Sequence, residues 1–135
     1  MASLASFRAA WSPRLLSVLR IISAFLLMGH GMPKLFSFPA AREAGEPPLL
    51  SLLGVAGMLE VYGGALLLIG LFTSPVAFLL SGFTAVAYFM VHAPRGFWPI
   101  LNGGTLAALY SFVFIYLAAA GGGPWSVDAL IRRRR

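Results

Sequence analysis

Residues 49–71, LLSLLGVAGMLEVYGGALLLIGL, decide the fold class of this chain. They contain no ionisable side chain except the carboxylate of Glu60 and the phenol of Tyr62. A helix needs about 20 apolar residues to cross the roughly 30 Å hydrocarbon core of a bilayer. The stretch therefore predicts a transmembrane helix with one acid near its middle.

Composition extends this prediction to the whole chain of 135 residues, of which 59% are hydrophobic and 10% charged. Soluble domains usually carry about 25% charged residues. Three further apolar runs, at about 14–32, 75–92 and 100–120, are also candidate spans. The first is expected to stop at Pro33, and Ser74, followed by Pro75, is expected to be the N-cap of the third. We therefore predict an all-α integral membrane protein in the lipid bilayer, with a four-helix bundle over residues 14–120.

The two ends of the chain are predicted to lie outside the bundle. In residues 1–13, Leu4, Phe7 and Trp11 share one helical face, which is typical of an interfacial segment. Residues 121–135 form a basic tail that ends in four arginines.

Basic residues predict the orientation of the bundle. Four spans put both termini on one side, together with Arg8, Arg14, Arg20 and the terminal arginines, whereas the opposite loops hold fewer basic residues. The positive-inside rule then places both termini in the cytoplasm. The net charge of +6 is therefore interpreted as a topology signal, and no nucleic acid partner is predicted.

Glu60 is the strongest candidate functional residue, because an ionisable side chain inside a span is costly and usually marks function. Gly57 and Gly64, at i−3 and i+4, share its helical face and would let a neighbouring helix approach closely. A functional role for Glu60 is favoured over the structural alternative, in which Glu60 only forms a pair with Lys34 or His30.

Other polar residues gather toward the outer face, at the end opposite the termini. Tyr88 and His92 continue a stripe with Ser81 and Thr84 on the third span, although Ser and Thr alone often bond only their own helix. His30 and Lys34 end the first span, and Asn102 begins the fourth. We predict an outward-opening polar pocket around Glu60, His30, Tyr88 and His92.

These positions are where the chain resembles the DoxX family of small four-span membrane proteins. The resemblance covers about residues 15–130 and rests on GHGMPKLF, GMLEVYGGALLLIGLFT, HAPRGFWPILNGG and GGGPWSVD, in that order. It implies a bacterial cytoplasmic (inner) membrane protein, linked to quinone-dependent oxidoreductases. The family positions matched are His30, Lys34, Glu60, His92, and Asn102 with Gly103 and Gly104. Thr105 departs from the pattern, because family members commonly have a glutamate there.

Quinone reduction consumes two electrons and two protons. Glu60, His30 and His92 are the predicted catalytic residues, as proton donors and carbonyl ligands, and Tyr62, Tyr88, Lys34 and Asn102 are predicted to bind the quinone. The chain has no cysteine and no CxxCH site, so iron–sulfur clusters held by this chain are excluded and no metal site is predicted. Haem ligated by His30 and His92 is conceivable but not expected.

The electrons must then come from a redox partner subunit or a diffusible substrate. The leading prediction is a membrane subunit of a quinone-linked oxidoreductase. The alternatives are a non-catalytic anchor or assembly subunit, and a small transporter that would have to form a homo-oligomer.

Overall fold

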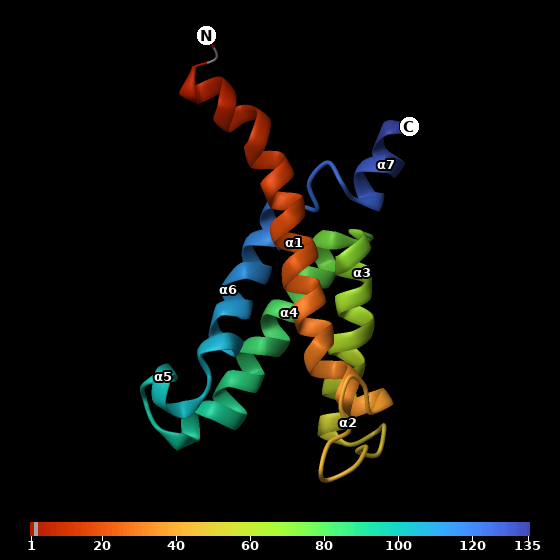
Figure 1. Ribbon diagram of the computed structural model, residues 1–135, viewed down its shortest axis with the longest axis vertical. Helices are drawn as coiled ribbons and strands as arrows, with labels where there is room; N and C mark the ends of the chain where they lie inside the picture. Colours follow the sequence, from red (N-terminus) through yellow and green to blue (C-terminus); the bar gives the residue numbers. More distant parts are fainter. Residues whose placement is uncertain (2) are drawn as a thin grey trace.

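The computed structural model describes residues 1 and 3–135, and every regular element among them is helical (Figure 1). The elements are α1 (Leu4–Phe36), α2 (Leu52–Met58), the π-helical η1 (Leu59–Gly63), α3 (Gly64–Ile69), α4 (Thr73–Ala87), the π-helical η2 (Tyr88–His92), the 3₁₀ turn η3 (Ala93–Arg95), α5 (Pro99–Asn102), α6 (Thr105–Ala120) and α7 (Val127–Arg133). The all-α prediction is confirmed for this part of the chain.

α1 is longer than predicted at both ends. The prediction that the first span stops at Pro33 is wrong, because the helix continues through Pro33 to Phe36. The helix also runs through Pro13 without a break. Residues 4–13 are thus the first part of α1, and Ser3 is its N-cap. Residue 2 lies outside the described residues. Proline removes one backbone hydrogen bond but does not end a helix that tertiary packing holds. The last turns of α1 pack closely on α2 and η1.

The second span is one continuous helix from Leu52 to Ile69, with the π-helical turn η1 around Glu60. Ser51 caps its start by accepting a hydrogen bond from the Gly54 N–H at 3.1 Å. Gly70, with φ of 71°, ends it in the left-handed conformation.

The third span begins at Thr73, so the predicted N-cap role of Ser74 is wrong. Asp128 of α7 supplies the cap instead. Its two carboxylate oxygens accept hydrogen bonds from the Phe72 and Thr73 N–H groups, each at 2.9 Å. A partner far along the sequence thus replaces the local cap that the sequence suggested.

The predicted fourth span is interrupted. α5 ends at Gly103, which has φ of 74°, and α6 begins at Thr105. Three helices of the described chain, Leu4–Phe36, Leu52–Ile69 and Thr73–Arg95, are long and apolar enough to cross a membrane, whereas the apolar helix Thr105–Ala120 is shorter. A helix of that length spans about 24 Å, at 1.5 Å per residue.

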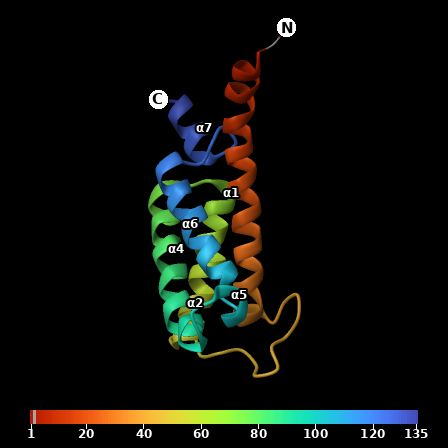
Figure 2. The same cartoon turned by 90° about the vertical axis from the view of Figure 1, so that its left-hand side faces the viewer.

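The helices converge at one end of the molecule and diverge at the other. α1 packs along α2, η1 and α3, and α4 packs along α6. Figure 1 shows both termini at the convergent end, and Figure 2 shows the loop after α1 at the opposite end. The buried core of Ala24, Leu27, Leu67, Ala77, Leu80, Tyr110, Phe114 and Leu117 lies mainly toward the convergent end. The other half of the molecule is left less tightly filled.

Candidate functional site

A cavity of about 610 Å³ occupies the divergent half, between the two helix pairs. This volume is in the range of small-molecule sites. α1, α2 with η1, α4 with η2, and α6 all contribute to its walls, which are mostly aliphatic. Its polar lining residues are His30, Lys34, Glu60, Thr84, His92 and Tyr110.

Glu60 and Lys34 form an ion pair in this cavity, with 2.6 Å between Oε2 and Nζ. Their side chains are 10% and 17% exposed, respectively, so the pair is largely buried. The close approach of α1 depends on glycine, because a Cβ on Gly31 would meet the Glu60 Cβ at 2.7 Å. A Cβ on Gly57 would lie 3.0 Å from the Lys34 Cβ. The structural pairing anticipated for Glu60 is present, and the pair faces the cavity.

His30 lies one helical turn inward from Lys34, is exposed, and lines the cavity. Its ring packs edge-on against Tyr110, with 6.3 Å between the ring centroids and 87° between the planes. The sequence did not single out Tyr110, because it lies in the half of the fourth span that carries few polar residues.

His92 lines the cavity near the end of η2, and its Nδ1 lies 3.2 Å from the Asn102 carbonyl oxygen. A carbonyl can only accept, so Nδ1 carries the proton of this hydrogen bond. In a neutral ring, Nε2 then remains as an acceptor. His92 can therefore donate a second hydrogen bond to a ligand only as the imidazolium.

Tyr88 and Asn102 stand behind the cavity wall rather than in it. Asn102 is 2% exposed, and its side chain is fully used: Nδ2 donates to the Gly96 carbonyl and the Tyr88 hydroxyl, and Oδ1 accepts from the Gly104 N–H. The two residues hold the break between α5 and α6 and, through the Asn102 carbonyl, orient His92. Direct ligand contact, which the sequence predicted for both, does not follow from this geometry.

Tyr62 is outside the cavity. It is 58% exposed and is absent from the lining residues, although it is only two residues from Glu60. A two-residue step on a helix turns a side chain well away from its neighbour. The prediction that Tyr62 binds the quinone is not supported by its position.

Both π-helical segments border the cavity, η1 with Leu59 and Glu60, and η2 with Met90, Val91 and His92. π-helical turns inside α-helices are rare and often occur at functional sites. Each turn rotates the side chains after it, and thereby sets which residues face inward. No residue pattern in the sequence identified either turn.

Arg20 forms a second buried polar centre, at the convergent end. It is fully buried, and Nη1 donates to the Leu67 and Leu68 carbonyls at 3.1 and 3.2 Å. Nε donates to the Gly122 carbonyl at 3.0 Å, and Nη2 to the Trp125 carbonyl at 2.5 Å. Arg20 therefore joins the end of α3 to the segment before α7, a structural role that the sequence did not indicate.

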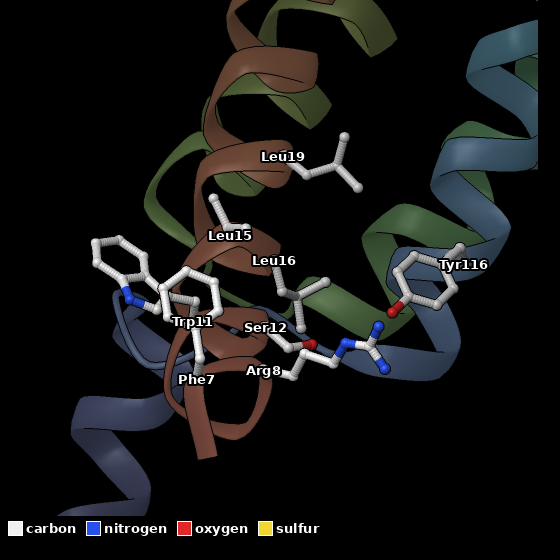
Figure 3. A pocket seen from close by; sticks show the side chains of 8 residues that line it. All are labelled: Phe7, Arg8, Trp11, Ser12, Leu15, Leu16, Leu19 and Tyr116. Atoms are coloured by element: carbon white, nitrogen blue, oxygen red, sulfur yellow. The ribbon is translucent and has the colours of Figure 1, made fainter. Parts of the chain in front are cut away.

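A more open groove of about 560 Å³ lies at the convergent end, between α1 and α6 (Figure 3). Phe7, Trp11, Leu15, Leu16 and Leu19 give it apolar walls, with Arg8, Ser12 and Tyr116 as polar members. It lacks an acid and shares no residue with the cavity around Glu60. Tyr116 is therefore a useful reference position on the same helix as Tyr110.

Within the described residues, no group of three or more His, Cys, Asp or Glu side chains is placed to hold a metal ion. The cavity instead combines a long apolar surface with a compact polar region. Such a site suits an amphipathic organic molecule.

The model of the DoxX family matches residues 15–93. A Haemophilus influenzae protein, named only as an uncharacterized protein, is 42% identical over 126 residues, which cover 87% of this chain and 91% of that protein. No solved structure matches the chain.

Proposed function

The chain belongs to the DoxX family, and from that membership we propose that it is the membrane subunit of a quinone-linked oxidoreductase. The quinone is the substrate of the cavity between the helix pairs. The observation that carries the proposal is the placement of the Glu60–Lys34 pair and His30 in the wall of an otherwise aliphatic cavity.

The shape of the cavity suits a ligand that arrives from the bilayer. Leu52, Val86 and Met90 line it and are 71%, 54% and 55% exposed, so its apolar wall continues onto the outer surface of the helices. A lipophilic tail can remain among these side chains while a polar ring reaches the ion pair. A quinone has this chemical form.

Reduction of a quinone to a quinol takes up two electrons and two protons. Lys34, as an ammonium, can donate a hydrogen bond to a carbonyl oxygen while it remains paired with Glu60. Glu60 can accept a proton from the outer aqueous phase and pass it inward, with His30 as the second proton carrier. Both protons then reach the oxygens that become hydroxyls.

The two electrons come from a redox partner subunit or from a diffusible reductant. Thr105 stands where family members commonly have a glutamate, so in this chain the proton route depends on Glu60 and His30. Asn102 and Tyr88 act as positioning residues, because they orient His92 and hold the start of α6.

We place the protein in the bacterial cytoplasmic membrane, with both termini in the cytoplasm. Both termini lie at one end of the molecule, together with the exposed terminal arginines (Figure 1). The chain has no cysteine, so single cysteines at Glu43 and Arg135 report the topology directly. A membrane-impermeant thiol reagent should label position 43 in whole spheroplasts and position 135 only after lysis, and the reverse result would invert this topology.

A non-catalytic anchor is the second candidate, and the Glu60–Lys34 ion pair itself favours it. A paired acid needs no ligand to explain its presence in a span. In that case the cavity would be filled by lipid or by a helix of a larger complex, and no quinone would bind specifically.

The test is purification in a mild detergent, followed by mass spectrometry of the lipid extract. We expect a quinone at near-stoichiometric amount in the wild type, and its loss in Glu60→Gln and His30→Ala. Glu43→Gln, an exposed loop position, is the matched control and should retain the quinone. A wild-type protein free of quinone but bound to other membrane subunits would favour the anchor.

A further inference from the structure

Tyr110 carries a polar group that the fold leaves unused. It lies on α6, is 6% exposed, and its hydroxyl oxygen has no hydrogen-bond partner among residues 1 and 3–135. Buried polar atoms in native proteins nearly always have a partner, because an unpaired one loses its hydration without compensation. A partner supplied by a bound molecule would resolve this imbalance.

The other polar groups around the cavity contrast with Tyr110. Glu60 and Lys34 pair with each other, and the Thr84 hydroxyl donates to the Leu80 carbonyl at 2.9 Å. His92 Nδ1 bonds the Asn102 carbonyl. The Tyr110 hydroxyl, which has no hydrogen-bond partner, therefore differs from these other polar groups, each of which has a partner within the protein.

The ring of Tyr110 is held firmly. It stacks on Phe114, with centroids 5.2 Å apart and planes 6° apart, and His30 packs edge-on against it. Tyr110 lies six residues beyond Gly104, or about 9 Å of helix rise from the start of α6, so it marks the deep end of the cavity. The hydroxyl itself is buried, and both Tyr110 and the exposed His30 line the cavity.

The charges of the wall restrict the chemistry of that ligand. Among the lining residues, Lys34 and Glu60 are the charged pair, and they neutralise each other. An anionic or cationic head group would find no free counter-charge there, which disfavours its transfer from water. A neutral group with an acceptor oxygen fits, and an aromatic ring can pack against the aliphatic walls.

We propose that Tyr110 is the deep binding residue of the cavity, and that its hydroxyl donates a hydrogen bond to a carbonyl oxygen of a neutral, lipophilic aromatic ligand. The proposal rests on the proposed function, because a quinone is the ligand of this class that the function requires. The proposal adds Tyr110 as a recognition residue. Its hydroxyl would favour a ligand with a carbonyl oxygen over a ligand that has no hydrogen-bond acceptor.

The test compares wild type, Tyr110→Phe and Tyr116→Phe in detergent. Tyr116 is the matched control, because the same substitution is made on the same helix at a residue that is 55% exposed and lines the other groove. Binding is titrated with three probes: decylbenzoquinone, an alkyl aromatic ketone, and an alkylbenzene that lacks any oxygen. The thermal midpoint of each ligand-free protein is measured in parallel.

We expect Tyr110→Phe to weaken both carbonyl probes about 3- to 10-fold, as the loss of one hydrogen bond does, and to leave the alkylbenzene unchanged. Tyr116→Phe should bind all three probes as the wild type does. Because the hydroxyl has no protein partner, Tyr110→Phe should leave the midpoint of the ligand-free protein unchanged or raise it.

Two results would overturn the proposal: equal affinity of wild type and Tyr110→Phe for the carbonyl probes, or a clear loss of thermal stability in ligand-free Tyr110→Phe. Failure of the proposed function gives a different pattern. The wild type would then bind the ketone in a Tyr110-dependent way and show no affinity for the quinone.

Discussion

Glu60 and Lys34 are coupled strongly enough that each determines the effect of changing the other. Removing one partner of a buried pair leaves an uncompensated charge, which typically costs about 3–5 kcal/mol. Lys34→Met should therefore destabilise the protein by roughly 3 kcal/mol, because Glu60, 10% exposed, has no other cation within bonding distance in the described chain.

Glu60→Gln should cost less, about 1–2 kcal/mol, since the flexible stem of Lys34 can carry its ammonium outward. The double variant should recover most of the stability that Lys34→Met loses. Denaturation in mixed detergent measures all three, and additive effects of the two single changes would show that the pair is not coupled.

Arg20 is the residue on which the convergent end depends most. Its guanidinium serves four carbonyls from two distant segments, a geometry that lysine cannot reproduce. Arg20→Lys and Arg20→Met should both lower stability, by roughly 3 kcal/mol or more, because each leaves buried carbonyls unpaired. Arg14→Met is the control, since Arg14 is exposed and lies over the Trp11 ring. Equal melting of the Arg20 and Arg14 variants would contradict this role.

Single residues differ in how well the sequence predicted them. Glu60 was identified because an acid in an apolar run stands out, and the neighbouring glycines pointed to a closely packed helix. The structural role of Arg20 was missed because its acceptors, in residues 67–68 and 122–125, are far away in the sequence. Tyr110 was missed because aromatic residues are common in spans, and only the packed structure shows that its hydroxyl lacks a partner.

Among the elements, α7 has a capping role that depends on pH. Burial of the Asp128 carboxylate opposes its ionisation, but hydrogen bonds from the Thr73 and Phe72 N–H groups and the charge of Arg132 outweigh this. The pKa of Asp128 is thereby held below its ordinary value of 3.8. A lowered pKa contributes stability that is complete above the unfolded value and is lost as the pH falls through the folded value.

Asp128→Ala should therefore lower stability by about 1 kcal/mol at neutral pH, the usual cost of losing a helix cap. The difference from the wild type should shrink as the pH falls below 3.8, and it should vanish only below the lower pKa of the folded protein. The thermal midpoints of the wild type and Asp128→Ala, measured between pH 3 and pH 7, give this difference. A difference that persists unchanged at the acid end would mean that the carboxylate charge is not what caps α4.

Helix boundaries and π-helical turns were the elements least accessible to sequence reasoning. Pro33 was expected to end the first span, but packing of α1 on α2 continues the helix to Phe36. Ser74 was expected to cap the third span locally, but Asp128 does so from the other end of the chain. In both cases a tertiary contact overrides a preference that is correct for an isolated segment.

At the level of the whole molecule, one end is closed and the other is open. The core and the Arg20 contacts hold the helices together near the termini, whereas the Glu60 cavity occupies the divergent half. The exposed helix surfaces are rich in Leu, Ile, Val and Phe, as expected for contact with lipid. The all-α membrane architecture was predictable from composition, whereas the divergence of the two helix pairs depends on packing that sequence patterns do not encode.

The most direct test of the central claim is the site at which a photoreactive quinone attaches. The protein in native-lipid nanodiscs is illuminated with an azidoquinone, and labelled peptides are identified by mass spectrometry. We predict labelling in residues 53–60 and 87–92, suppressed by excess unlabelled quinone and reduced in Glu60→Gln. Labelling confined to the groove around Phe7 and Tyr116, or labelling that excess quinone does not suppress, would contradict the account.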